Sequence, residues 1–98
     1  MKTEKVDVLV ICAGPAGTIA TSLIHPHGLN VKVVEREKFP RFVIGESLLP
    51  RVMDHLEEAK LLDAVKKAGF QEKFGAKFVR GNEICDFNFS NQFSKGWT

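Results

Sequence analysis

The sequence predicts an α/β fold centred on a parallel βαβ unit. Three observations favour it. An apolar strand covers about residues 5–11 and runs into a turn of small residues. A helix begins at Pro15, directly after that turn. A second apolar strand covers about residues 30–35 and ends in Glu35, eighteen residues after Gly17.

The first helix is expected to run from Pro15 to about His25. Pro15 suits the first turn of a helix, where its missing N–H is not needed. The helix should end in the segment 25–28, because Pro26 cannot extend it and Gly28 can turn the chain.

A helical segment and a β-hairpin are expected in the second half. After a loop at 36–46, Ser47 is a good N-cap, and an apolar stripe follows at helical spacing: Leu48, Leu49, Val52, Met53 and Leu56. A short helix at about 61–68 should end at Gly69. The apolar period then becomes two, and the turn Gly81-Asn82 predicts a hairpin.

Composition excludes several classes of protein. The chain has 98 residues, 44% of them hydrophobic, and a net charge of +2, which suits a small α/β domain rather than a disordered chain. Its charges are mixed, so no basic face predicts nucleic-acid binding. The longest apolar run, 8–13, is too short to span a bilayer, and the start does not resemble a signal peptide. A cytoplasmic protein is expected.

The cysteines and histidines do not suggest a metal site or a disulfide framework. Cys12 and Cys85 are expected to be free thiols. His25, His27 and His55 lack partners at metal or triad spacing, so we expect surface residues.

Only two parallel strands are visible, although parallel strands are normally covered on both faces. We therefore expect residues 1–98 to be the N-terminal portion of a larger domain, without an internal boundary. Because the edges of such a sheet are open, we expect the isolated chain to aggregate.

The turn at 12–17 carries the chemistry. A helix N-terminus binds a pyrophosphate through free amides and the helix dipole, provided that no bulky side chain intervenes. Gly14, Ala16 and Gly17 meet that need, and the acid Glu35 is placed to accept hydrogen bonds from a ribose. These features predict a Rossmann-like, dinucleotide-binding unit.

One position departs from the pattern G-x-G-x-x-G. This chain has Cys12 where the pattern has its first glycine. A side chain there would strain the turn or crowd the phosphates. Three interpretations stay open: a tolerated substitution with weaker binding, a cysteine with a redox role, and a chain that has lost its cofactor.

Further motifs support a specific resemblance. They are the turn 12–17, Glu35-Arg36, Phe39-Pro40-Arg41 and the segment 44–50, Ile-Gly-Glu-Ser-Leu-Leu-Pro. With them the chain resembles the N-terminal part of an FAD-dependent oxidoreductase of the flavin-dependent halogenase and geranylgeranyl reductase group, within the flavoprotein monooxygenase fold.

The resemblance implies FAD as cofactor and a role for particular residues. The turn would face the pyrophosphate, Glu35 would hold the ribose, Arg36 would lie over the adenosine, and Arg41 would sit near the phosphates. Glu46 and Ser47 would line the path to the flavin. The cofactor-binding set is therefore Cys12, Ala13, Gly14, Pro15, Ala16, Gly17, Glu35, Arg36, Arg41, Glu46 and Ser47.

The resemblance also implies that Lys73 is a catalytic residue that handles hypohalous acid. A solvent-facing lysine is the plainer interpretation, and Lys77 is a neighbouring competitor. Ser47 could be only a helix cap. The phenylalanines after residue 70 could line a substrate pocket, but alternation on strands more often marks a core.

The predicted function is the FAD-binding portion of a flavin-dependent oxidoreductase that acts on a small molecule. The parent reaction would be halogenation, hydroxylation or reduction, with a flavin reductase or NAD(P)H as the source of electrons. A non-catalytic relative that binds FAD weakly and an NAD(P)-binding module are the alternatives.

Overall fold

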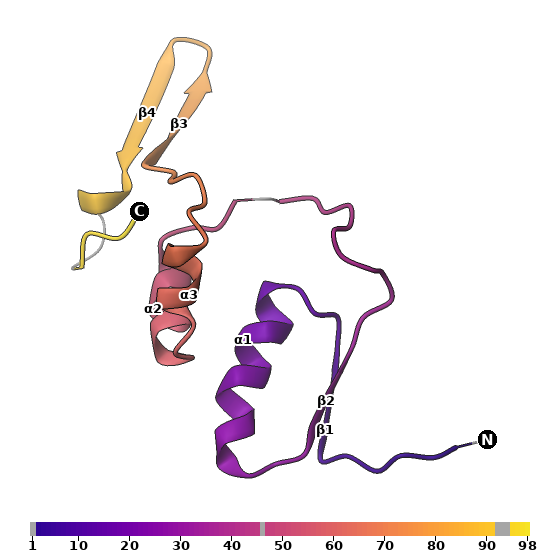
Figure 1. Ribbon diagram of the computed structural model, residues 1–98. Helices are drawn as coiled ribbons and strands as arrows, with labels where there is room; N and C mark the ends of the chain where they lie inside the picture. Colours follow the sequence, from indigo (N-terminus) through magenta and orange to yellow (C-terminus); the bar gives the residue numbers. More distant parts are fainter. Residues whose placement is uncertain (1, 46, 92–94) are drawn as a thin grey trace.

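The computed structural model describes residues 2–45, 47–91 and 95–98. Helices and strands follow one another along the chain in the order shown in Figure 1. The elements are β1 (Val8–Ile11), α1 (Pro15–Ile24), η1 (His25–His27), β2 (Val31–Val34), α2 (Arg51–Glu58), α3 (Leu62–Lys67), β3 (Gly75–Arg80), β4 (Glu83–Asn88) and η2 (Phe89–Asn91).

The predicted βαβ unit is confirmed. Strands β1 and β2 pair in parallel, with Val8 opposite Val31 and Ile11 opposite Val34. Both strands are shorter than the sequence suggested. The carbonyl of Asn30 accepts hydrogen bonds from the amides of Asp7 and Val8, so the ladder starts there.

Helix α1 ends where its sequence predicts. It gives way at Ile24 to the single turn η1, which contains Pro26. Gly28 follows with φ of 80°, and its amide donates a hydrogen bond to the carbonyl of His25, 3.1 Å away. That left-handed conformation is open to glycine without steric cost.

Helix α2 begins later than expected, and Ser47 does not cap it. The N-cap position is Pro50, which makes no side-chain capping bond. Proline disfavours the helical conformation in the residue before it, so the helix cannot extend back through Leu49 to Ser47. Of the predicted apolar stripe, Leu56 is buried, whereas Leu48 and Leu49 lie outside the helix and are exposed.

A tight connection joins α2 to α3. The amide of Leu61 donates to the carbonyl of Leu56, and the amide of Lys60 donates to that of Glu57. These two bonds make a Schellman ending, in which the residue at Lys60 is left-handed. Lys60 adopts φ of 62° although it is not glycine.

The hairpin is confirmed, with Arg80 opposite Glu83 across the Gly81-Asn82 turn. Phe78 and Phe87 share one face and meet edge to face, with ring centroids 5.7 Å apart. That face is not a core, because Phe78 is 61% exposed and Phe87 is 40% exposed. The expectation of ordinary core packing is therefore wrong for these described residues, while Phe89, beyond the strand, is buried.

The elements form an elongated arrangement, in which the hairpin extends away from the βαβ unit (Figure 1). The radius of gyration is 17.5 Å, against about 13 Å for a compact chain of this size. Helix α1 covers one face of the β1–β2 sheet, and Leu9 and Ile11 remain exposed. Such uncovered apolar faces support the prediction of aggregation, which light scattering would test.

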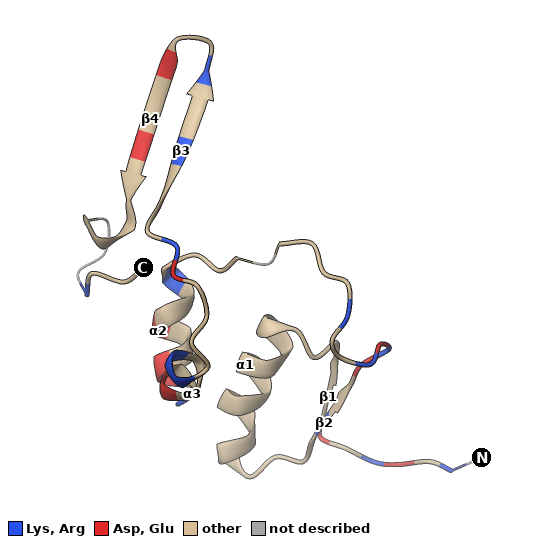
Figure 2. Cartoon of the chain, turned by 45° about the horizontal axis from the view of Figure 1, so that its top comes forward, with Lys and Arg blue, Asp and Glu red and all other residues tan. Residues whose placement is uncertain are grey.

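Charged side chains are distributed unevenly (Figure 2). Helix α1 carries none, whereas both signs occur together in α2, in α3 and on the hairpin. On the hairpin they form the pairs Lys77–Asp86 and Arg80–Glu83. In the described part of the chain, every helix is too short or too polar to cross a membrane.

Candidate dinucleotide-binding site

The turn between β1 and α1 presents an open helix end. The amide of Cys12 donates to the carbonyl of Val34, 2.7 Å away, which fixes the turn to the end of β2. Gly14 is the N-cap of α1, and within the described residues 14–24 the helix has neither a side-chain cap nor an acid in its first turn. Its first amides, and the positive end of its dipole, therefore remain available to an anion.

Gly17 is required by close packing. A Cβ atom there would lie 2.1 Å from the carbonyl oxygen of Cys12 and 3.1 Å from a methyl group of Val10. Any side chain would therefore push α1 away from β1. The glycine sets the approach of the helix to the strand.

Gly14 is placed differently. An added Cβ would make ordinary contacts, 3.6 Å from Arg41 Nη2 and 3.8 Å from Cys12 Sγ, and the φ of −74° suits any residue. Packing within the chain therefore does not demand glycine at this position. A close approach by a ligand to the turn would demand it.

Glu35 is fixed at the end of β2 by backbone amides. Its Oε1 accepts from the amide of Ala13 at 3.1 Å, and its Oε2 accepts from that of Glu37 at 2.9 Å. The Glu37 amide bond, followed by the Ala13 bond, holds the pKa of this carboxyl below its ordinary value, against the opposing effect of burial. Oε2 keeps a lone pair that can accept a ribose hydroxyl.

Arg41 completes a cluster with Glu35 and Cys12. Its Nη2 lies 3.3 Å from Glu35 Oε1 and 3.4 Å from Cys12 Sγ, and its guanidinium lies 5.2 Å from the centre of the Phe39 ring. Arg41 Nε is buried and has no hydrogen-bond partner among the described residues. A buried donor of this kind favours an anionic or polar ligand beside it.

The Cys12 backbone departs from ordinary geometry. Its φ is 88°, in the region that favours glycine, so the side chain is held with strain of about 1–2 kcal/mol. This agrees with the predicted cost of losing the first glycine. Both Cys12 and Cys85 are free thiols, as expected, and both are exposed.

A groove of about 1570 Å³ runs from this turn toward helices α2 and α3. Ala13, Gly14 and Arg41 line it near the turn, and Ser47 and Lys73 also line it. Lys73 Nζ donates a hydrogen bond to Ser47 Oγ, 3.2 Å away. Lys77 lies on the hairpin beside Asp86 instead and does not line the groove.

Two other predicted cofactor-binding residues remain, Arg36 and Glu46. The Arg36 side chain is 91% exposed and lies 3.4 Å from Glu37, outside the cluster around Glu35. Glu46 lies outside the described residues. The phenylalanines divide as well, since Phe39 and Phe70 line the groove while the hairpin rings do not.

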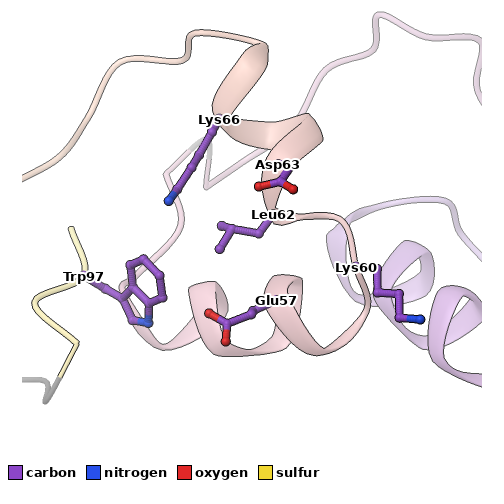
Figure 3. A pocket seen from close by; sticks show the side chains of 6 residues that line it. All are labelled: Glu57, Lys60, Leu62, Asp63, Lys66 and Trp97. Atoms are coloured by element: carbon purple, nitrogen blue, oxygen red, sulfur yellow. The ribbon is translucent and has the colours of Figure 1, made fainter.

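Sequence reasoning missed a second, smaller pocket on α2 and α3 (Figure 3). It has a volume of about 560 Å³ and is lined by Glu57, Lys60, Leu62, Asp63, Lys66 and Trp97. Trp97 Nε1 donates to Asp54 at 3.1 Å, and Lys66 lies 5.3 Å from the indole ring. The signal was faint, because a single tryptophan and scattered charges are typical of many surfaces.

The residues near the turn fit a dinucleotide cofactor. An uncapped helix end and a guanidinium suit the pyrophosphate, a fixed carboxylate suits a ribose, and the groove leaves room for the remainder. Fold and site together define a dinucleotide-binding βαβ protein.

The chain belongs to the FAD binding domain family, whose model matches residues 5–95. FAD is accordingly its cofactor. The resemblance noted from the motifs is thereby confirmed, and so is the assignment as the FAD-binding portion of a flavin-dependent oxidoreductase-like protein.

Individual relatives agree. The chain is 41% identical over 82 residues to the tryptophan 2-halogenase of Chondromyces crocatus, covering 84% of this chain and 16% of that protein. It is 39% identical over 72 residues to the flavin-dependent halogenase ptaM of Pestalotiopsis fici, covering 74% and 13%. The chain spans only 13–19% of the length of the curated relatives it matches.

Solved structures also match. A flavoprotein/dehydrogenase from Cytophaga hutchinsonii is 74% identical with a TM-score of 0.82, over 96% of this chain and 23% of that one. The myxobacterial chondrochloren halogenase CndH is 38% identical with a TM-score of 0.75, over 89% of this chain and 21% of that one.

Proposed function

We propose that residues 1–98 form the N-terminal portion of an FAD-binding domain, and that the parent protein is a flavin-dependent oxidoreductase of the halogenase type. The observation that carries the proposal is the uncapped amino end of α1, which faces the groove beside Arg41. The names of the halogenase relatives support the reaction type.

In this proposal each part of the cofactor meets a distinct group. The backbone amides of Gly14, Ala16 and Gly17 bind the pyrophosphate, and Glu35 Oε2 accepts a hydrogen bond from the adenosine ribose. Arg36 covers the adenosine, and Arg41 lies near the phosphates. Glu46 and Ser47 line the path toward the flavin.

FAD supplies the redox chemistry, and the protein binds and orients it. Lys73 is the proposed catalytic residue, because it lines the same groove as the dinucleotide turn. The parent protein would take a small-molecule substrate in the cytoplasm, with a flavin reductase or NAD(P)H supplying electrons. Its free thiols suit that reducing compartment.

A second candidate is a flavin-dependent dehydrogenase without halide chemistry. The 74% identity to the flavoprotein/dehydrogenase of Cytophaga hutchinsonii favours it. Turnover of the full-length gene product with reduced flavin, oxygen and bromide separates the two. A brominated product supports the halogenase type, and bromide-independent reduction of an acceptor dye supports the dehydrogenase.

A titration of FAD into the full-length gene product, followed by flavin fluorescence, tests the binding site. The matched variants are Gly14→Ala and Gly17→Ala. Gly14→Ala should keep the fold and weaken FAD binding about tenfold, because the new methyl group separates the phosphates from the amides. Gly17→Ala should disturb the fold itself, because its Cβ would overlap the Cys12 carbonyl.

Two outcomes would contradict the proposed site. One is a full-length wild-type protein that is folded by circular dichroism and does not bind FAD. The other is a folded Gly14→Ala variant with the FAD dissociation constant of the wild type.

A further inference from the structure

The side chain of Lys73 is held by a residue far from it in sequence. Lys73 Nζ donates to Ser47 Oγ across a separation of 26 residues. We propose that Ser47 is a positioning residue, whose hydroxyl directs the Lys73 ammonium group into the groove. The inference rests on the proposed function, in which Lys73 acts on the reacting species.

The backbone around Lys73 is anchored, so only the side-chain torsions of this residue remain free to change. The amide of Phe89 donates to the carbonyl of Phe74, 2.9 Å away. At the next residue, Gly75, a Cβ would lie 2.1 Å from the carbonyl oxygen of Phe87, so the strand packs there without a gap. The start of β3 therefore fixes where the lysine stem begins.

Ser47 is anchored from the other direction. It lies three residues before Pro50, which is fully buried, and the carbonyl of Leu49 accepts a bond from Val52. Since Ser47 does not cap α2, its hydroxyl is not used by the helix. It is available to the lysine.

The hydrogen bond therefore restricts a side chain that is otherwise mobile. A lysine stem is flexible, and an exposed one samples many directions. The hydrogen bond from Lys73 Nζ to Ser47 Oγ narrows these directions to the ones that face Ser47, and both residues line the groove shared with the dinucleotide turn. Lys77 provides the contrast, because it faces Asp86 on the hairpin.

The test is the rate at which acetic anhydride acetylates each lysine, resolved by mass spectrometry. The variants are Ser47→Ala, Ser47→Thr and Ser47→Cys, with Ser22→Ala in α1 as the matched control. The acetylation rate of Lys73 should rise about threefold in Ser47→Ala, because Nζ no longer donates a hydrogen bond to the serine hydroxyl. Ser47→Thr should restore the slower rate, and Lys77 should not change.

Equal Lys73 rates in wild type and in Ser47→Ala would overturn the inference. So would failure of Ser47→Thr to restore the rate. If Ser47→Ala is unfolded by circular dichroism, the near-isosteric Ser47→Cys takes its place, since a thiol is a weak acceptor and should also raise the rate.

Turnover of the full-length gene product links the bond to the reaction. Ser47→Ala should lower kcat, and Ser47→Thr should recover it, whereas an unchanged kcat in Ser47→Ala would contradict positioning. FAD binding by the wild type is measured in parallel. Its absence would overturn the proposed function, while the acetylation rates would still report on the Lys73–Ser47 bond.

Discussion

Arg41 Nη2 lies 3.3 Å from Glu35 Oε1, and both side chains are largely withdrawn from solvent, at 19% and 15% exposed. This ion pair ties the loop after β2 to the end of that strand, directly beside the dinucleotide turn. Because Glu35 is also bound by two backbone amides, Arg41 adds to a carboxylate that is already fixed.

Replacement of Arg41 should weaken FAD binding. In Arg41→Gln the guanidinium is lost from Glu35 and from the groove, and a charge-assisted contact to phosphate disappears. We expect a dissociation constant raised about tenfold, measured by flavin fluorescence. Arg36→Gln is the control, because its side chain is 91% exposed, and its effect should be smaller. Equal losses in both variants would refute a special role for Arg41.

Cys12→Gly should tighten FAD binding, because glycine adopts the φ of 88° without strain and removes the thiol from the turn. If FAD binding tightens the turn, the strain at Cys12 opposes binding. About 1 kcal/mol of such strain corresponds to roughly a fivefold change in the FAD dissociation constant. Cys12→Ala separates the causes, because it removes the thiol but keeps a Cβ. Identical dissociation constants for wild type and Cys12→Gly would show that the first glycine matters little.

The stability of the site should fall in acid. The folded pKa of Glu35 is lowered, chiefly by the Glu37 amide bond, so the carboxylate form is favoured in the folded chain. Its contribution is present above the ordinary pKa of 4.5 and is lost as the pH falls through the lower, folded pKa. Urea unfolding at a series of pH values between about pH 3 and about pH 6 measures how the free energy of unfolding depends on pH. The free energy of unfolding should change less with pH in Glu35→Gln than in the wild type. An identical change in both would contradict the assignment of this pH dependence to Glu35.

Lys60→Gly should stabilise the α2–α3 connection. Lys60 has φ of 62° at the Schellman position, where glycine avoids the steric cost of a side chain. We expect a gain of about 0.5–1 kcal/mol in the free energy of unfolding, measured by urea denaturation. Lys67→Gly, in the last turn of α3, is the control and should lose stability. A loss in both variants would contradict the role of the left-handed conformation.

The sequence predicts the elements whose signals are local. The βαβ unit follows from two apolar strands around a turn of small residues, and the hairpin follows from its two-residue turn. The end of α1 follows from Pro26 and Gly28. In each case the residues that decide the structure are neighbours in the chain.

Three features were predicted wrongly or missed, and only some of them depend on distant partners. The cap assigned to Ser47 was wrong because Pro50 decides where α2 begins. The Arg41–Cys12 contact joins residues 29 apart, so no spacing rule shows it. The exposure of Phe78 was missed for another reason, since alternation shows that a face is apolar but not what covers it.

The position of FAD in a crystal structure of the full-length gene product, grown with the cofactor, tests the central claim most directly. The pyrophosphate should lie at the amino end of α1, within hydrogen-bond distance of the amides of Gly14, Ala16 and Gly17, with the ribose at Glu35. A pyrophosphate bound away from that helix end, with the turn facing only solvent, would contradict the account.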